Sequence, residues 1–439
     1  MGGIRLMIKI LNTQSRDFDT LFEQILLRGK QDIEGVTHKA SQILQEVANH
    51  KQSAILEQVR LFDEWNPKTI NDLFITPQEC QKAYQALDKD QAKALHIAYE
   101  RIYSFHQKQK QQTWLDIEDN GSILGQRWSP IERVGLYIPG GKAAYPSSLL
   151  MNAIPAIVAG SQSIVVCTPT PKNQTNHLLL AALHICGIKE IYKVGGASAI
   201  GLMAYGIENI KKVDFISGPG NIFVATAKKI VFGEVGIDMI AGPSEIAIIA
   251  DDKANVEYLA YDLLSQAEHD EMASSFLFTT SCEKAKQVAQ TIDKILPTLP
   301  KERIASQSIN NRGAIIVCDT LDEAIHLSNQ LAPEHLEILT ERPFEVMPKI
   351  KHAGAIFLGE NTPEPIGDYL AGPNHTLPTG GSARFFSPLG VENFMKRSSI
   401  ISFSKQAIQS LGKDCSLLAH LENLDAHKQA VLARLDTKQ

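Results

Sequence analysis

The chain has 439 residues, too many for one ordinary hydrophobic core, so we expect two sizeable domains with smaller appendages. Its 44% hydrophobic and 21% charged residues are values of a globular protein and exclude an intrinsically disordered chain. The formal net charge of -6 gives no basic field for nucleic acid or an anionic membrane, which favours a small-molecule partner.

The six cysteines are scattered, without a CxxC pair, a pattern typical of proteins whose thiols stay reduced. The N-terminal residues lack the apolar core of a secretory signal, and no run approaches the roughly 20 apolar residues of a membrane span. We therefore expect a cytoplasmic protein without a membrane anchor.

Residues up to about Asp119 predict a mostly helical region. Within 36–65 and 77–107, apolar residues recur at i, i+3, i+4 and i+7. Such a region more often supports a fold than carries catalysis, so we look for the functional residues further along the chain.

From Ile123 onward, short β-branched runs alternate with helical segments. The alternation restarts after residues 236–251 and continues to Glu360, which predicts two α/β units, each with a parallel sheet covered by helices. After about Phe386 the strand rhythm is lost. The chain ends in one predicted helix, residues 416–435, whose length could reach another subunit.

Two segments with glycine and proline each join a predicted strand to a predicted helix, at 137–150 and 215–229. Backbone N–H groups in such turns can face an anion, and a dinucleotide pyrophosphate would fit. Neither segment matches GxGxxG, so a tight strand-to-helix turn without a ligand stays an alternative.

Gln266 and His269 lie three residues apart on a predicted helix, so both side chains leave the same face and could share one metal ion. Glu268 and Asp270 are competing ligands from the same stretch. A solvated helix end without a metal is the alternative.

Glu334 and His335 follow a helical pattern that ends at Pro333, and they lie in an otherwise apolar run. Placing two ionisable groups there is costly unless they are paired or used. A carboxyl group whose pKa is raised by burial and an imidazole whose pKa lies near neutrality suit general base catalysis. A salt-bridged pair at a helix end is the alternative.

Residues 367–381 predict a glycine-rich loop that holds Asp368 and His375. Asp368 could supply an anionic metal ligand, whereas we expect His375 to position the loop. Glu422 and His427 lie five residues apart on the predicted C-terminal helix, too far round to share one ideal face. They reach one ligand only if it spans both, and an ordinary exposed helix is the alternative.

Several segments between Trp128 and His427, taken together and in order, resemble the histidinol dehydrogenase family. They are RVGLYIPGGKAAYPSSLLMNAIPA, VGGASAIGLMAYG, ISGPGN, DMIAGPSEI, SQAEHD, LAPEHLEI, GDYLAGPNHTLPTGG and ENLDAHKQA. The family's reaction is the zinc-dependent oxidation of L-histidinol through L-histidinaldehyde to L-histidine with two NAD, the last steps of histidine biosynthesis.

The resemblance implies an α/β fold with two Rossmann-like parallel-sheet domains, a helical N-terminal region, and a small C-terminal tail domain exchanged between the subunits of a homodimer. The implied parts are the N-terminal segment (1–35) and a first α/β domain with the metal and acid/base residues (36–136 with 244–385). They are followed by a second α/β domain that binds NAD (137–243) and the tail domain (386–439).

The resemblance also implies the residues of the site. One zinc ion per subunit would be held by Gln266, His269, Asp368 and, across the dimer, His427 of the partner subunit, a set that leaves the metal open to substrate atoms. Substrate contacts are implied for Ser244, Gln266, His269, Glu334, His335, Asp368, Glu422 and His427.

Roles follow for the acid/base pair and for the cofactor. His335 would take the hydroxyl proton as hydride leaves for NAD, and Glu334 would deprotonate the water that attacks the aldehyde. Tyr137 and Asn221 match the family's NAD contacts. Where the family has a glutamine this chain has Ser198, whose shorter side chain loses reach, so that a water can intervene.

Two other interpretations remain on the residues alone. A zinc hydrolase would use the metal, Glu334 and water for amide or ester cleavage, but the chain lacks HExxH and the glycine-rich turns would be unexplained. A catalytically silent metal-binding protein of the same fold is the second interpretation. The presence of Glu334, His335 and the ligand set argues against it.

Overall fold

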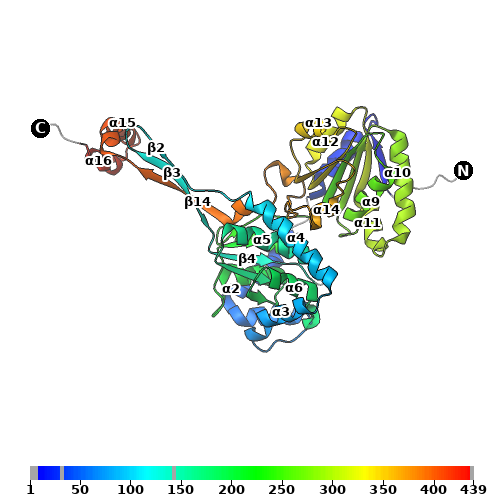
Figure 1. Ribbon diagram of the computed structural model, residues 1–439, viewed down its shortest axis with the longest axis horizontal. Coiled ribbons are helices and arrows are strands. Elements are labelled where there is room, and N and C mark those ends of the chain that lie inside the picture. Colours follow the sequence, from blue (N-terminus) through cyan, green and yellow to red (C-terminus); the bar gives the residue numbers. More distant parts are fainter. Residues whose placement is uncertain (1–7, 30–33, 141–144, 436–439) are drawn as a thin grey trace.

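The computed structural model describes residues 8–29, 34–140 and 145–435, and three sheets organise the chain (Figure 1). Two are parallel sheets covered by helices, which confirms the predicted pair of α/β units. The third is antiparallel and forms an arm that projects from the rest of the chain. Four stretches lie outside the described residues, two in the N-terminal segment, one in the first glycine turn and one at the end of the tail: 1–7, 30–33, 141–144 and 436–439.

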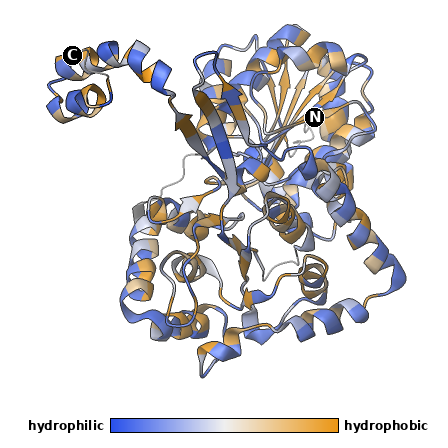
Figure 2. Cartoon of the chain, turned by 60° about the vertical axis from the view of Figure 1, so that its left-hand side comes forward, coloured by the Kyte–Doolittle hydropathy of each residue, from blue (hydrophilic) through white to orange (hydrophobic). Residues whose placement is uncertain are grey.

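The six-stranded parallel sheet has the order β1-β11-β10-β9-β12-β13. Its strands are β1 (Lys9–Asn12), β9 (Glu245–Ala250), β10 (Ser274–Thr279), β11 (Gly313–Val317), β12 (His335–Leu339) and β13 (Ala355–Leu358). The four central strands are buried along their whole length, because helices cover both faces. Accordingly, Figure 2 shows them as almost continuously hydrophobic.

Alternate residues of each strand face opposite layers of helices. In β9, Ile246 and Ile248 belong to the core beneath one layer, whereas Ala247 and Ile249 belong to the core beneath the other. The first layer is α9 (Val256–Ala267), α10 (Cys282–Ile295) and α11 (Glu302–Arg312), and the second is α1 (Phe18–Leu26), α12 (Leu321–Leu331) and α13 (Pro343–Val346).

The five-stranded parallel sheet has the order β6-β5-β4-β7-β8. Its strands are β4 (Arg133–Tyr137), β5 (Ser163–Cys167), β6 (Glu190–Tyr192), β7 (Phe215–Ser217) and β8 (Gly236–Ile237). One face is covered by α3 (Pro77–Gln85), α4 (Lys89–Gln107), α5 (Pro146–Ala159) and α6 (His177–Ile185), and the other by α2 (Glu34–Phe62), α7 (Gly196–Tyr205) and α8 (Ile222–Val231).

The implied domain boundaries need three corrections. Residues 114–130 supply strands of the arm, and β4, which begins at Arg133, belongs to the five-stranded sheet. Helices α2, α3 and α4 pack on α5 to α8 of the five-stranded sheet, so residues 36–107 do not belong to the unit formed by 244–385. Strand β1 of the N-terminal segment 1–35 pairs with β11 and extends the six-stranded sheet. An amphipathic pattern shows that a helix has a buried face, but it does not say which distant sheet covers that face.

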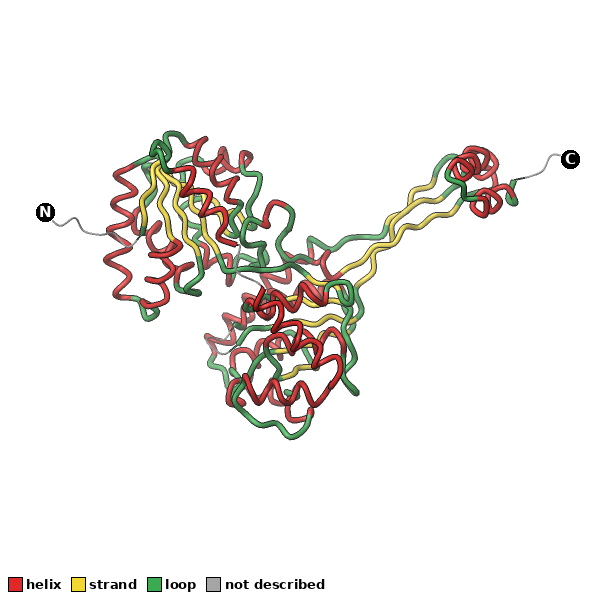
Figure 3. The backbone as a smooth tube through the Cα atoms, turned by 180° about the vertical axis from the view of Figure 1, so that it is seen from behind, coloured by secondary structure: helices red, strands yellow, loops and turns green. Residues whose placement is uncertain are grey.

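The arm is built from two distant parts of the chain. Strand β3 (Ile123–Pro130) pairs antiparallel with β2 (Trp114–Ile117) and with β14 (Met395–Ser402), and helices α15 (Lys405–Leu421) and α16 (Asp425–Leu432) form its tip (Figure 3). The prediction that strands end near Phe386 is therefore wrong. The single helix predicted for 416–435 is also wrong. The helix is interrupted at Asn423, whose φ of 58° is left-handed.

Short 3₁₀ turns complete the described elements: η1 (Leu27–Gly29), η2 (Ile70–Leu73), η3 (Pro171–Asn173), η4 (Leu296–Thr298), η5 (Met347–Lys349), η6 (Ser382–Arg384) and η7 (Val391–Phe394). No helix in the described part of the chain combines the length and apolarity that a membrane crossing requires.

Candidate active site

Glu334 and His335 lie at the junction between α12 and β12. Helix α12 ends at Leu331, because Ala332 takes a left-handed conformation with φ 48° and Pro333 follows it. The predicted helix end before the pair is thus confirmed, and His335 begins β12, next to β9. Both residues are buried, with 6% and 4% of their surface exposed.

The main chain of Glu245, the first residue of β9, holds both side chains. Its N–H donates to Oε2 of Glu334 (2.8 Å), and its carbonyl oxygen accepts from Nδ1 of His335 (2.9 Å). Because a carbonyl oxygen can only accept, Nδ1 carries the hydrogen and the lone pair of neutral His335 is on Nε2. That Nε2 atom is buried without a hydrogen-bond partner among the described residues. It lies 3.9 Å from Oε1 of Glu364 and from Oδ1 of Asp368.

Burial shifts the two pKa values in opposite directions. It raises the pKa of Glu334 well above its ordinary value, opposed by the Glu245 N–H and reinforced by the carboxylates of Asp368 and Glu364. It lowers the pKa of His335, although the Asp368 carboxylate counteracts it. The raised carboxyl pKa agrees with the prediction, whereas the imidazole pKa is lower than the near-neutral value expected. A neutral imidazole therefore lies beside a strongly basic carboxylate, with 3.7 Å between Nδ1 and Oε2.

A possible metal-binding group adjoins this pair. His269, Glu364 and Asp368 each offer one ligand atom, and these atoms lie within 4.8 Å of one another. His269 lies in the turn that follows α9, because the helix ends at Ala267, so its predicted place on the helix is wrong. Asp368 lies within the short helix α14 (Glu364–Tyr369) and not in the predicted loop.

Gln266 is a further candidate ligand that the sequence analysis named. It is fully buried near the end of α9, and its main-chain carbonyl accepts from the N–H of His269 (3.3 Å). Neither atom of its amide group has a hydrogen-bond partner among the described residues. A buried amide without partners is costly, so this side chain fits a bound ligand. Amide oxygen, imidazole and carboxylate are donors that zinc accepts, and the residues present fit such an ion.

Glu364 is the residue of this group that the sequence analysis missed. Its side chain is 1% exposed, and its Oε2 accepts from Oγ of Ser265 (2.9 Å). Burial, with the Asp368 carboxylate, raises its pKa to about 8. The sequence signal was the i, i+4 spacing of Glu364 and Asp368, which puts both on one face of a helix.

A second pair of carboxyl groups, those of Asp262 and Glu337, adjoins Glu364. Oε1 of Glu337 accepts from the N–H of Glu364 (2.7 Å), and the carboxyl group of Asp262 in α9 interacts with that of Glu337. Burial raises the pKa of Glu337 well above its ordinary value and that of Asp262 to about 6. Because two buried carboxylates repel each other, we expect the pair to share a proton in the folded protein.

His375 and Ser244 lie at the edges of the site. Nδ1 of His375 donates to the main-chain oxygen of Asp368 (3.1 Å), a contact that joins the glycine-rich loop to α14 and supports the expected positioning role. Ser244 is half-buried and directly precedes Glu245.

The expected cofactor residues lie in the five-stranded sheet domain, where strands give way to helices. Tyr137 ends β4 and Asn221 is the N-cap of α8, so both glycine turns join a strand to a helix as predicted. In the second turn, a Cβ on Gly218 would lie 2.0 Å from the carbonyl oxygen of Tyr137, so only glycine permits this close approach. Dinucleotides commonly bind at such carboxyl ends of parallel strands.

The polar atoms of these residues are partly used within the fold. The hydroxyl of Tyr137 accepts from the N–H of Gly196 (3.2 Å), and burial raises its pKa to about 12. The hydroxyl of Ser198 donates to the carbonyl of Gly195 (2.8 Å). Oδ1 of Asn221 caps the first turn of α8.

Glu422 and His427 are not at this site in the single chain. Glu422 is the C-cap residue that follows α15, His427 lies in α16, and both are exposed on the arm. Figures 1 and 3 show the arm directed away from the six-stranded sheet. One chain thus brings His269 and Asp368 to the Glu334–His335 pair. It leaves Glu422 and His427 away from that pair.

Comparison with known proteins gives consistent results. A family model described as histidinol dehydrogenase matches residues 26–435. A histidinol dehydrogenase of Helicobacter hepaticus is 61% identical over 430 residues, which cover 98% of this chain and 99% of the relative. One of Wolinella succinogenes is 60% identical over 428 residues, with the same coverage of 98% and 99%. The crystal structure of histidinol dehydrogenase from Elizabethkingia anophelis superposes with a TM-score of 0.92 at 35% identity and covers 98% of this chain and 99% of that one.

Proposed function

Because the chain belongs to the histidinol dehydrogenase family, we propose that it oxidises L-histidinol to L-histidine in two consecutive steps at one zinc- and NAD-dependent site. The chain is an oxidoreductase of histidine biosynthesis. The observation that carries the more detailed proposal is the buried Glu334–His335 pair, held by Glu245 beside His269 and Asp368.

His335 is the base of the alcohol step in this proposal. Its Nδ1 hydrogen is donated to Glu245, so the basic lone pair on Nε2 is available for the hydroxyl proton of the substrate. The lowered pKa supports this role, because the imidazole stays neutral at pH 7.

Glu334 is the base of the aldehyde step. Its pKa, raised by burial, makes the ionised carboxylate a stronger base for the water that attacks the aldehyde. The Glu245 N–H binds Oε2, which leaves the other carboxylate oxygen, Oε1, for that water. Burial of the pair also excludes other water from the aldehyde between the two steps.

Gln266, His269 and Asp368 would hold the zinc ion, with His427 of the partner subunit as the fourth ligand. Tyr137 and Asn221 would contact NAD, and Ser198 would reach it through a water, since its hydroxyl hydrogen is donated to Gly195. When bound, zinc supplies a Lewis acid that orients the substrate, and NAD supplies the hydride acceptor. Oε1 of Glu364, which has no hydrogen-bond partner in the part of the chain that the structure describes, would lie beside the metal ligands His269 and Asp368.

Three further parts of the proposal concern the molecule as a whole. We propose a homodimer in which the tail, residues 386–439, supplies Glu422 and His427 to the site of the other chain; their exposure on a projecting arm supports it. We propose that the five-stranded sheet domain binds NAD and that the six-stranded one holds the metal and the bases. The six free cysteines support a cytoplasmic location.

The stoichiometry of NADH tests the proposal. Each histidinol consumed should yield two NADH and one histidine, because both oxidations occur at one site. NADH is measured by absorbance and histidine by amino-acid analysis, with other amino alcohols as controls for the substrate. Accumulation of free aldehyde at one NADH per substrate would contradict the coupled mechanism, and turnover without NAD would favour a hydrolase instead.

A further inference from the structure

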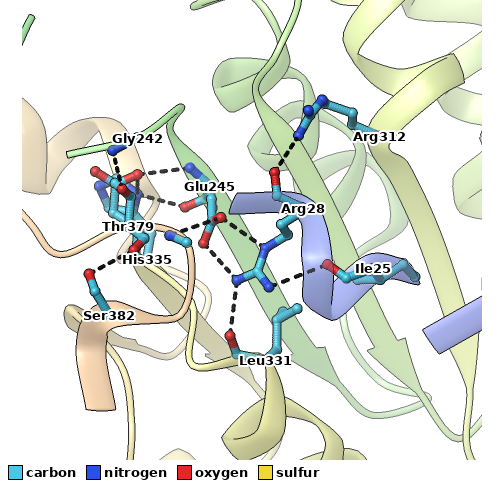
Figure 4. Close-up of polar contacts among 11 residues, drawn as sticks. Ile25, Arg28, Gly242, Glu245, Arg312, Leu331, His335, Thr379 and Ser382 are labelled. Carbon is cyan, nitrogen blue, oxygen red and sulfur yellow. Dashed lines mark hydrogen bonds and ion pairs between the residues drawn. The ribbon is translucent and has the colours of Figure 1, made fainter. Parts of the chain in front are cut away.

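Arg28 reaches the active site from a segment that the sequence analysis left without a role. It lies in η1, directly after α1, and its guanidinium donates from Nε to Oε1 and from Nη2 to Oε2 of Glu245, both at 2.8 Å (Figure 4). The two side chains are only 5% and 3% exposed. Nη2 also donates to the main-chain oxygen of Leu331 (2.9 Å), the last residue of α12. A bidentate contact of this kind fixes the relative orientation of the two side chains and also pairs their charges.

The Glu245 carboxylate is also bound from the opposite side. Its Oε1 accepts from the N–H of Gly380 (3.1 Å), in the glycine-rich loop that follows His375. The neighbouring Thr379 accepts from the N–H of Gly242, just before β9. Glu245 therefore joins three segments distant in sequence: the end of α1, the start of β9 and the glycine-rich loop.

The two main-chain atoms of Glu245 bind the two proposed bases, whereas its side chain binds Arg28. A rotation of this residue would move the donor to Glu334 and the acceptor for His335 together. Misplacement of a catalytic group by about 1 Å can cost roughly 100-fold in rate.

We propose that the Arg28–Glu245 ion pair is a positioning device for the oxidation: it fixes the Glu245 main chain so that Glu334 and His335 face the reacting atoms. The inference rests on the proposed function, because it assumes that these two residues are the bases. Arg28 and Glu245 are positioning residues that act through the pair.

The test compares Arg28→Met and Arg28→Lys in the full-length, zinc-loaded protein. Arg28→Met removes the contact, and Arg28→Lys keeps the positive charge but loses the bidentate geometry. We expect kcat to fall about 100-fold in Arg28→Met and about 10-fold in Arg28→Lys, with KM changed much less. Oxidation of histidinol and oxidation of added histidinal should fall together, because Glu245 holds both bases.

Arg133→Met is the matched control. Arg133 makes a similar bidentate contact with Glu190 (2.9 and 2.6 Å). It begins β4, and Tyr137 lies at the other end of that strand. Its loss should leave kcat unchanged. Zinc content and the melting temperature are measured for every variant, so that kcat refers to folded, metal-loaded protein, and Arg28→Lys keeps the test valid if Arg28→Met does not fold.

A readout without turnover separates this inference from the proposed function. The ¹⁵N signals of the His335 imidazole, assigned by their loss in His335→Asn, should change in the Arg28 variants and not in Arg133→Met. Unchanged signals would overturn the positioning role, whatever happens to kcat. Changed signals with normal kcat for both steps would show that the contact holds His335 but that the pair is not catalytic, which overturns the assignment of the bases.

Discussion

At the scale of single residues, the two bases can be distinguished by what each one must do with a proton. In the proposed mechanism, Glu334 acts on water only after the aldehyde has formed, whereas His335 acts on the alcohol. Glu334→Gln keeps the size of the side chain and the acceptor for the Glu245 N–H, but removes the base. We expect aldehyde oxidation to fall by about 10²- to 10⁴-fold and alcohol oxidation to fall much less. Single-turnover assays with histidinol and with histidinal measure the two steps, and an equal fall in both would contradict the division of roles.

The raised pKa values of Asp262 and Glu337 predict how the stability of the metal-free protein depends on pH. The folded-state pKa of each is raised, that of Asp262 to about 6, whereas an unfolded carboxyl group has a pKa of about 4. The folded state therefore binds more protons between these values. The stabilisation from Asp262 is complete below about pH 4 and is lost as the pH rises through about 6. That from Glu337 is lost as the pH rises through the raised pKa of its own folded state.

The measurement is the melting temperature between about pH 4 and 7, compared in the metal-free parent and in Asp262→Asn. The variant has no second carboxylate beside Glu337, so its melting temperature should fall less steeply as the pH rises. A fall as steep as that of the parent would contradict a proton shared by this pair.

Sequence reasoning could single out residues whose type is unusual for their surroundings, and it missed those whose role depends on a distant partner. Glu334 and His335 were identifiable because two ionisable groups interrupt an apolar run. Arg28 and Glu245 were not, because their partners are supplied by segments that only the tertiary fold brings together. Glu364 was signalled only by its i, i+4 spacing from Asp368. Spacing and loop composition raised Gln266 and Asp368 as candidate ligands, and the family resemblance selected them over Glu268 and Asp270.

At the scale of elements, the candidate metal ligands come from α9, from the turn that follows it and from α14. The sheet beneath them has its own buried cores on both faces. We therefore expect chelation to abolish turnover while far-UV circular dichroism keeps its folded signal, and added zinc to restore activity. Global unfolding on chelation would instead assign the ion a structural role.

Zinc retention tests the individual ligands. His269→Ala and Asp368→Ala should each lower the zinc that remains after dialysis, measured by atomic absorption, because each removes a direct ligand. His375→Ala should lower it less, since His375 contacts the main chain of Asp368 and positions the loop. A loss of zinc in His375→Ala equal to that in the other two would make His375 a ligand and contradict the proposed set.

The elements themselves were predictable where the pattern was local. Alternating strands and helices gave both parallel sheets, and the strand-to-helix turns before α5 and α8 lie where they were expected. Strand β14 was missed because it is exposed along most of its length, in an arm without a buried face to impose alternation. Asn423 broke a predicted helix because asparagine tolerates a left-handed backbone that the apolar pattern does not reveal.

At the scale of the whole molecule, the arm determines whether the site can be complete in one chain. It carries Glu422 and His427 away from the Glu334–His335 pair, and its tip exposes Leu417, Leu418 and Leu421. Exposed leucines on a projecting element are costly in water, which supports a second copy of the chain as its partner. If the arm supplies ligands across a two-fold assembly, each site needs residues from both chains.

Mixed dimers test this exchange. Two inactive variants, His427→Ala and Glu334→Ala, are unfolded together in equal amounts and refolded. In a mixed dimer one site has Glu334 from one chain and His427 from the other, whereas the second site carries both lesions. Random pairing makes about half of the dimers mixed, so activity should recover to roughly a quarter of wild type. If the arm instead served its own chain, every site would keep one lesion, and mixed dimers confirmed by mass would stay inactive.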